Sequence, residues 1–330
     1  MKKTNLLKIS ALTLAFALTA CGGTSENGGN GQDNQGGFDT SRKISLYSRA
    51  AGSGTRECFF ETIKYKEVAK EDKWESGVTV STKSANSELM SAIANDEYGI
   101  GYCSLDSLSS VSGIKGLKYE GVEATKENVL NESYKLKRNF NYVIRDYSGA
   151  TDTSAKEAVD GFIAFLTTTR EGQAVISSKG GIIQNNPNLV AFSSIIDNYP
   201  VFKSDKKVTI DFCGSTSVES IIKAAVEKIE TLIPNGNLTY VLNQSGSGDA
   251  VKGVTEGKNG KEFGIGFLSR EINADEKAKL NENNKNGAFA IDAVVPIVNA
   301  KNTAYTETTA AELVSIYKGE KTLRSDVAAK

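Results

Sequence analysis

Three short loops, rich in glycine and hydroxyl side chains, each lie between a strand-like run and a run with helical spacing. They occupy residues 48–56 (SRAAGSGTR), 213–217 (CGSTS) and 243–249 (NQSGSGD). The strand-like runs before them are 44–47, 208–212 and 238–242. A chain that repeats a strand, a glycine turn and a helix is constrained toward an α/β fold, because each helix must pack on a sheet of mostly parallel strands.

The rest of the chain continues this alternation. Further strands are predicted at 78–81, 100–104, 140–144, 263–268 and 288–299, and further helices at 86–95 and 155–168. Apolar residues at 159, 162, 163 and 166 share one face of the last helix, and core packing explains that stripe. Small ligands in such folds lie where strands end and helices begin. The three loops occupy those positions.

The loops carry the chemistry of an anion site. Backbone N–H groups at a helix start are unpaired and partly positive, so they favour an anion. Ser53 and Thr55 add hydroxyl donors, and Arg49 adds a planar fork of donors. Hydroxyl and glycine residues before a helix are also the usual N-cap, and capping explains a single loop of this kind. Three loops together, one with an arginine, favour binding.

The N-terminus has the form of a lipoprotein leader. Lys2, Lys3 and Lys8 surround the start of an apolar run at 9–18, which is followed by Leu-Thr-Ala-Cys ending at Cys21. The apolar run is too short for a permanent membrane-spanning helix. We therefore expect a signal peptide at 1–21, lipidation of Cys21, and a flexible tether at 22–42 that holds the protein to the outer face of a bacterial membrane.

The composition argues against nucleic-acid binding and against most enzymatic functions. The net charge is −1, which gives no reason to expect nucleic acid, and histidine is absent, which removes the usual group for acid-base work and metal ligation. No acidic cluster suggests a metal site, so we expect neither an enzyme nor a cofactor. After Cys21 three cysteines remain, at 58, 103 and 213, without C-x-x-C spacing. Three buried thiols are expected, although one disulfide with one free thiol stays open.

Several motifs together resemble one family, the phosphate-binding proteins of bacterial ABC phosphate importers, which are periplasmic-binding-protein-like. The resemblance covers about residues 44 to 325. It rests on residues 214–217 (GSTS), 246–248 (GSG), 269–272 (SREI), 49–56 (RAAGSGTR), 99–102 (GIGY), 124–129 (ATKENV), 134–138 (YKLKR) and 171–173 (EGQ).

The order of these motifs departs from the family's usual arrangement, in which the G-S-T-S half precedes the R-x-x-G-S-G-T-R half. Here the segment 309–320 that should join the halves stands at the C-terminus. The sequence therefore looks circularly permuted, with 185–205 joining the former ends, as is tolerated where old ends lie close together. A fused or misassembled sequence is the alternative.

The resemblance implies a two-lobed, type II fold in which each lobe is a mostly parallel sheet covered by helices and the ligand lies in the cleft between lobes. One lobe is expected to comprise residues 43–139 plus 295–330, with the R-x-x-G-S-G-T-R loop. The other is expected to comprise residues 140–294, with the G-S-T-S loop. Crossing points are expected near 138–143 and 294–298. Ligand would close the lobes like a hinge.

The resemblance also assigns the site. Anion contacts are carried onto Arg49, Ser53, Gly54, Thr55, Thr216, Ser217, Ser247 and Ser269. A surface salt bridge is the alternative for Arg49, while Arg56 and Arg270 either touch the ligand or neutralise nearby acids. The implied function is capture of inorganic phosphate for the permease subunits of an ABC importer, by a monomer without catalytic residues, metal or cofactor.

Specificity is left open by one position. Some family members have an aspartate where this chain has Ser269, and an acceptor there would recognise the proton that phosphate keeps and sulfate lacks. Asp249 could supply an acceptor, or it could only stabilise a helix start. Binding of another tetrahedral oxyanion, such as sulfate or molybdate, and a surface sensor without transport are the alternatives.

Overall fold

The computed structural model describes residues 38–257 and 261–327. The expected signal peptide at 1–21, its Cys21, and the tether as far as residue 37 lie outside this range. Residues 38–42, also expected in the tether, contact the folded unit: the rings of Phe38 and Tyr98 are 5.1 Å apart, and the carbonyl oxygen of Arg42 accepts from the N–H of Arg324. Within the described ranges, no helix combines the length and apolar character needed to cross a membrane.

Lobe A, as we name it, is built on three parallel strands. These are β1 (Ser45–Arg49), β2 (Val80–Lys83) and β3 (Gly99–Ser104), with β1 in the middle. Its helices are α1 (Gly54–Thr62), α2 (Asn86–Ala94), α3 (Lys126–Leu130) and α9 (Ala310–Tyr317). Three short strands complete it, β4 (Ile114–Gly116), β5 (Lys118–Tyr119) and β11 (Glu307–Thr308). Lobe A thus draws on both ends of the described chain.

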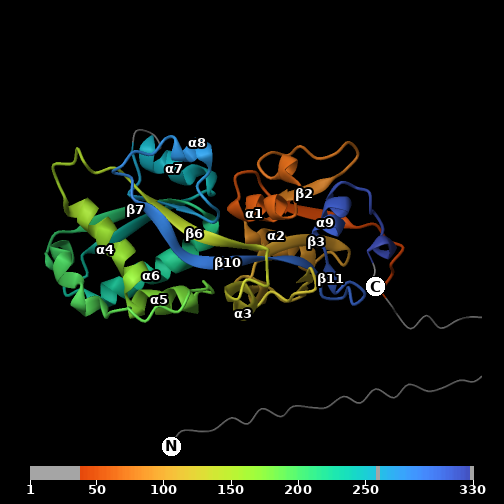
Figure 1. Ribbon diagram of the computed structural model, residues 1–330, viewed down its shortest axis with the longest axis horizontal. Coiled ribbons are helices and arrows are strands. Elements are labelled where there is room, and N and C mark those ends of the chain that lie inside the picture. Colours follow the sequence, from red (N-terminus) through yellow and green to blue (C-terminus); the bar gives the residue numbers. More distant parts are fainter. Residues whose placement is uncertain (1–37, 258–260, 328–330) are drawn as a thin grey trace, which may run out of the picture. The chain divides into compact units, whose positions relative to one another are not determined.

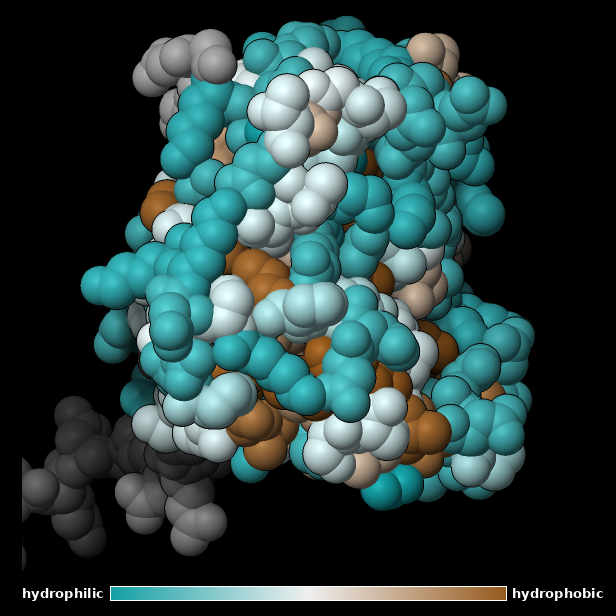
Figure 2. Space-filling model, turned by 90° about the vertical axis from the view of Figure 1, so that its left-hand side faces the viewer, coloured by the Kyte–Doolittle hydropathy of each residue, from teal (hydrophilic) through white to brown (hydrophobic). Residues whose placement is uncertain are grey.

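Lobe B repeats the plan with its own parallel strands. These are β7 (Val208–Gly214), β8 (Leu238–Gln244) and β9 (Ile265–Leu268), with β7 in the middle. Its helices are α4 (Ser154–Thr168), α5 (Arg170–Ser178), α6 (Glu219–Leu232), α7 (Gly248–Thr255) and α8 (Ala274–Lys277). The segment 185–205, expected to join former chain ends, leads from α5 to β7 through three single 3₁₀ turns. Hydrophilic side chains cover most of the outer face of this lobe (Figure 2).

Two antiparallel strands connect the lobes. The strand β6 (Lys137–Ile144) pairs with the first half of β10 (Asn286–Asn299), while the second half of β10 pairs with β3 and β4. The strand order is therefore β2-β1-β3-β10-β6-β9-β7-β8. In Figure 1 both long strands run from the group of elements around β7 toward the group around β3. They are the covalent and hydrogen-bonded link on which any hinge motion must turn.

Each lobe has its own apolar core. In lobe A the ring of Phe59 on α1 stacks on Tyr102 of β3 at 4.1 Å, in a cluster that Tyr317 of α9 also joins. In lobe B the predicted face of α4 is buried: its apolar side chains, including Phe162, are at most 6% exposed and belong to the core that contains Phe212. Burial of each such side chain stabilises the fold by about 1.5–3 kcal/mol.

The predicted elements agree with the observed ones in type and differ at their ends. The strand expected at 78–81 is β2, which begins two residues later because Val78 belongs to the turn before it. The helical run predicted to follow the loop at 48–56 begins inside that loop, at Gly54, since Ser53 caps it with its hydroxyl oxygen. These shifts bring the glycine and hydroxyl residues of the first loop into the first turn of α1, where its free N–H groups lie.

Candidate anion site

The first loop is held by β1 and α1. Arg49 ends β1, Ser53 is the N-cap of α1, and Thr55 lies in its first turn; all three side chains are buried. The Ser53 hydroxyl accepts from the N–H of Arg56 at 3.5 Å, which is the capping role that the sequence left open. The loop therefore presents the N-terminus of a helix, a buried hydroxyl and a buried guanidinium together.

The loops of lobe B present hydroxyl groups, and two of these loops also precede helix starts. Thr216 and Ser217 follow β7, Ser247 precedes α7, and Ser269 follows β9. The Ser247 and Ser269 hydroxyls lie 3.2 Å apart, and the N–H of Ser269 donates to Ser247 Oγ at 3.0 Å. Ser215 Oγ donates to Ser269 Oγ at 2.9 Å. Since both oxygens already accept a hydrogen bond, their own hydrogens are free to donate to each other or to a ligand.

The two sets of loops touch each other. Arg49 Nη2 donates to Thr216 Oγ1 at 3.3 Å, and the hydroxyls of Thr55 and Ser217 lie 3.2 Å apart. The carbonyl oxygen of Gly52 accepts from the N–H of Gly248 at 3.4 Å. The structure thus brings together residues from both lobes that are more than 160 positions apart in the chain.

Gly54 leaves no room for a side chain between the lobes. A Cβ atom on this residue would lie 2.4 Å from Ser269 Oγ and 2.5 Å from Ser247 Oγ, well inside van der Waals contact. Only glycine fits between α1 and these two hydroxyls in this arrangement. All the residues predicted to contact the anion therefore lie in one small region, although their role as ligands stays a prediction.

Arg49 is a buried cation with neutral partners. Its guanidinium donates to the Asn86 side-chain oxygen, to the Ser84 carbonyl at 2.6 Å and to Thr216, and within the described chain its buried Nε has no hydrogen-bond partner. Burial lowers the pKa of Arg49 to about 10, which means that its charge is poorly solvated. This is not the surface salt bridge that was the alternative, and an anion would compensate the charge.

The other two arginines considered from the sequence have acidic partners. Arg56 donates to Asp72 at 2.6 Å and stacks over Trp74. Arg270 forms a two-pronged pair with Glu276, at 2.7 and 2.8 Å, and its Nε lies 2.7 Å from Glu57 of lobe A. Arg270 thus joins the lobes through an ion pair, and both arginines neutralise carboxylates.

Asp249 lies at the start of α7 with its carboxylate exposed, where it accepts a hydrogen bond from the Ser245 hydroxyl. This position favours stabilisation of the helix dipole over contact with a buried anion.

Cys58, Cys103 and Cys213 are buried and free, as expected. Burial raises the pKa of the Cys213 thiol to about 12, so the thiol stays protonated at neutral pH. In residues 38–257 and 261–327 no cluster of acids and cysteines could hold a metal ion.

The sequence reasoning missed a second arginine beside the site. Arg138 on β6 pairs with Asp292 on β10 and reaches Ser217, with Ser104 as a further partner. A signal was present, since Asp292 is the single charge in the apolar run 288–299. A lone acid in a buried strand requires a partner, and Arg138 ends a motif that had already been noted.

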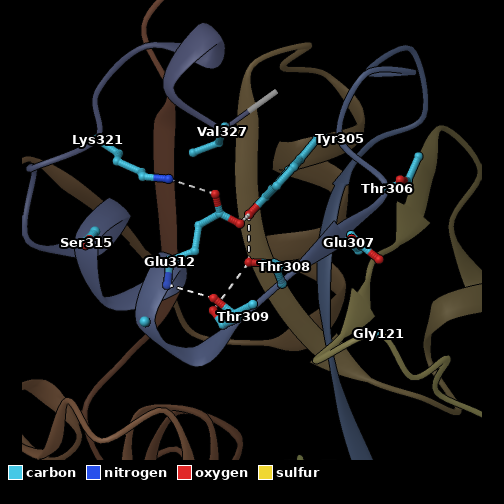
Figure 3. A pocket seen from close by; sticks show the side chains of 11 residues that line it. Gly121, Tyr305, Thr306, Glu307, Thr308, Thr309, Glu312, Ser315, Lys321 and Val327 are labelled. Carbon is cyan, nitrogen blue, oxygen red and sulfur yellow. Dashed lines mark hydrogen bonds and ion pairs between the residues drawn. The ribbon is translucent and has the colours of Figure 1, made fainter. Parts of the chain in front are cut away.

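A pocket elsewhere on lobe A has different chemistry. Figure 3 shows Glu312 between Lys321 and Tyr305, with dashed lines to both, and Thr308 next to Tyr305. The Glu312–Lys321 ion pair is 2.9 Å long, and the Tyr305 hydroxyl donates to Glu312 at 3.1 Å. Because these polar groups satisfy one another, the pocket lacks the uncompensated charge that distinguishes the Arg49 region.

Comparison with known proteins supports the resemblance. A PBP superfamily domain matches residues 203–327. A protein of Streptococcus agalactiae called phosphate-binding protein PstS 2 is 30% identical over 333 residues, or 99% of this chain and 98% of its own length. A Streptococcus pneumoniae protein with the same name is 28% identical over 98% of both chains.

A solved structure confirms the predicted fold. The phosphate-binding protein of a Streptococcus pneumoniae phosphate ABC transporter superposes with a TM-score of 0.62 and 25% identity, covering 86% of this chain and 99% of that one. The sequence alignments run along nearly the whole of both chains, so these relatives have their halves in the same order. The rearranged order is therefore shared, which a misassembled sequence would not produce.

Proposed function

The chain belongs to the PstS family of phosphate-binding proteins, and from that premise we propose that it captures inorganic phosphate between its lobes for an ABC importer. The observation that carries the proposal is the buried Arg49 guanidinium, whose hydrogen-bond partners are all neutral and which meets hydroxyl groups of the opposite lobe. A buried charge without a counter-charge is unfavourable, and a bound anion removes that cost.

The same geometry explains how binding without chemistry can be strong. Each hydrogen bond to a charged partner contributes about 1.5–3 kcal/mol, and several donors are already directed into the region. Arg49, Thr55 and the N–H groups of α1 come from lobe A, and the hydroxyls of Thr216, Ser217, Ser247 and Ser269 come from lobe B. An anion bonded to both sets holds the lobes together, which is a change that a permease can recognise.

Sulfate should be tested beside phosphate, because the hydroxyls of Ser247 and Ser269 can donate to either anion. Both oxygens accept hydrogen bonds from protein groups, so their hydrogens favour a ligand oxygen that only accepts. Such a site recognises sulfate nearly as well as phosphate. We propose phosphate as the ligand from the family, and sulfate as a competitor.

The proposed setting is the outer face of a bacterial membrane, with the chain tethered through lipid on Cys21. Support for it comes from the sequence of residues 1–21 and from a family that serves ABC transporters. Metabolic labelling with a palmitate analogue in a bacterial host should label the wild-type chain and not Cys21→Ser. Equal labelling of both would refute the anchor.

The main test is calorimetric titration of residues 38–330 with phosphate and with sulfate, after unfolding and refolding to remove bound anions. Phosphate binding with one site is expected, and a folded protein that binds no phosphate would overturn the proposal.

Delivery of phosphate to the importer is tested separately: the loaded protein should stimulate ATP hydrolysis by its permease in vesicles. Binding without stimulation would favour a sensor, and release of product from a chromogenic phosphate ester would indicate an enzyme.

A further inference from the structure

An ion pair lies between the two strands that connect the lobes. Arg138 of β6 and Asp292 of β10 are register partners, and their side chains are 2% and 1% exposed. Arg138 donates from Nε and Nη2 to the same oxygen, Asp292 Oδ2, at 3.0 and 2.7 Å. Arg138 Nη1 and Asp292 Oδ1 are also buried, and neither has a partner among the described residues.

Stability alone does not account for this pair. Burying two charges costs several kcal/mol per ion, and their attraction offsets this only where the remaining polar atoms are satisfied. Here one nitrogen and one oxygen are left without hydrogen bonds. A pair of apolar side chains would fill the same space without that cost, so the position of the pair matters more than its contribution to folding.

The pair is connected to the anion site on two sides. Arg138 Nη2 donates to Ser217 Oγ at 3.4 Å and to Ser104 Oγ at 2.7 Å. Ser104 Oγ also accepts from the amide nitrogen of Asn86 at 3.4 Å, and the amide oxygen of Asn86 accepts from Arg49. Two guanidinium groups are thus linked through one amide and one hydroxyl, and Asp292 is the carboxylate paired with Arg138.

The direction of these hydrogen bonds determines what Ser217 can do. Arg138 Nη2 carries two hydrogens for three acceptors, so the contact with Ser217 Oγ, the longest at 3.4 Å, shares a hydrogen with another acceptor. With its oxygen accepting from Arg138, the Ser217 hydroxyl donates its own hydrogen elsewhere. Its other close neighbour is the Thr55 hydroxyl of lobe A, 3.2 Å away. A bound anion between these groups would receive a hydrogen bond from a hydroxyl that the Arg138 cation polarises, and hydrogen bonds linked in this way strengthen one another.

We propose that Arg138, held by Asp292, is a positioning residue of the anion site that fixes Ser217 as a hydrogen-bond donor and places a second positive charge behind Arg49. The proposal rests on the proposed function and deepens it. This network holds two arginines and the carboxylate of Asp292, which pairs with Arg138, so one positive charge stays uncompensated and the site favours an anion over a neutral ligand. The arginine acts through Ser217 and through its field.

The test is a double-mutant cycle on the purified full chain, with phosphate affinity measured by calorimetry for wild type, Arg138→Gln, Ser217→Ala and the double variant. We expect Arg138→Gln to weaken binding roughly ten- to a hundredfold. The double variant should bind no more than about threefold more weakly than Arg138→Gln alone, because the two residues act as one unit. Arg145→Gln, a half-exposed arginine paired with Glu262 in lobe B, is the matched control and should bind like wild type.

A merely structural role predicts a different pattern. Two independent losses would multiply in the double variant, and that result overturns the proposal, as does an Arg138→Gln protein that binds like wild type. If Arg138→Gln does not fold, Arg138→Lys takes its place in the cycle. A smaller loss is then expected, because lysine keeps the positive charge and lacks the planar fork of the guanidinium, and the double variant should still bind no more than about threefold more weakly than the Arg138 variant alone. A wild-type protein that binds no phosphate would overturn the proposed function and this inference with it.

Discussion

The two lobes bring different chemistry to one contact region. Lobe A contributes the Arg49 guanidinium, while the loops of lobe B contribute the neutral hydroxyls of Thr216, Ser217, Ser247 and Ser269. Both lobes also present helix N-termini. Charge attracts an anion over a distance, whereas hydroxyls act only in contact and in a defined direction. We infer that lobe A captures the anion and that lobe B completes the site when the lobes close.

The largest effect on phosphate affinity is expected from a change at Arg49, the buried cation of lobe A. Arg49→Ala should weaken phosphate binding at least a hundredfold, because it removes the buried cation and two or more charged hydrogen bonds. Calorimetric titration measures this directly, with Arg145→Ala as the control that keeps wild-type affinity. Equal affinities for Arg49→Ala and wild type would show that lobe A does not supply the decisive charge.

The tight contact at Gly54 gives the second prediction. Gly54→Ala should weaken phosphate binding roughly tenfold or more, because the new methyl group would lie 2.4 Å from Ser269 Oγ and keep the lobes apart. Small-angle scattering with phosphate should show a more open protein. Gly149→Ala, where a Cβ meets nothing within 4 Å, is the control. A Gly54→Ala protein that closes and binds normally would contradict the observed contact.

The third prediction concerns selectivity between phosphate and sulfate, and it changes one hydroxyl residue of lobe B. Ser269→Asp places an acceptor where lobe B has donors, so it should reduce sulfate affinity about tenfold relative to phosphate, which retains a proton to donate. Competition titrations with the two anions give the ratio, and Ser269→Ala separates loss of the hydroxyl from gain of the carboxylate. An unchanged ratio would mean that residue 269 does not face the ligand's protonated oxygen.

The ion pair between lobes gives a smaller effect. Glu57→Gln should weaken phosphate binding a few-fold, because it breaks the 2.7 Å pair with Arg270, which still keeps Glu276. The faster dissociation of phosphate is measured by stopped-flow fluorescence. The control is Glu61→Gln, an exposed residue on the same helix. Tighter binding by Glu57→Gln would show that the pair opposes closure.

The smallest effect concerns stability and pH. Burial, with a further contribution from the nearby Asp292 carboxylate, raises the pKa of Asp106 from 3.8 to about 7. The folded chain therefore keeps a proton that the unfolded chain has lost, and the free energy of unfolding falls as pH rises from about 4 to 7. Asp106→Asn removes this loss, so it should be more stabilising at about pH 8 than at about pH 4.

Chemical denaturation at the two pH values measures the difference. Asp146→Asn is the control, because hydrogen bonds from Ser148 lower the pKa of Asp146 to about 2, so its carboxylate is ionised in the folded chain at both pH values and its contribution changes little between them. If Asp106→Asn shifts stability equally at both pH values, Asp106 is not protonated in the folded protein.

The sequence predicted the lobes' strands and helices well, because each loop carries glycine, a hydroxyl and a helix start at a fixed spacing. It also predicted that Arg49 and Thr216 would share a site, although only through resemblance to a family. The sequence could not predict which side chains from separate elements meet once the chain has folded. The Arg270–Glu57 pair and the Arg138–Ser217 contact join residues from separate elements, and neither partner shows its counterpart in local sequence.

A crystal structure of the protein grown with phosphate tests the central claim most directly. The account predicts one phosphate within hydrogen-bonding distance of the Arg49 guanidinium and of at least two hydroxyls of lobe B, with the lobes closed on it. A phosphate bound by one lobe alone, or bound away from Arg49, would contradict the account.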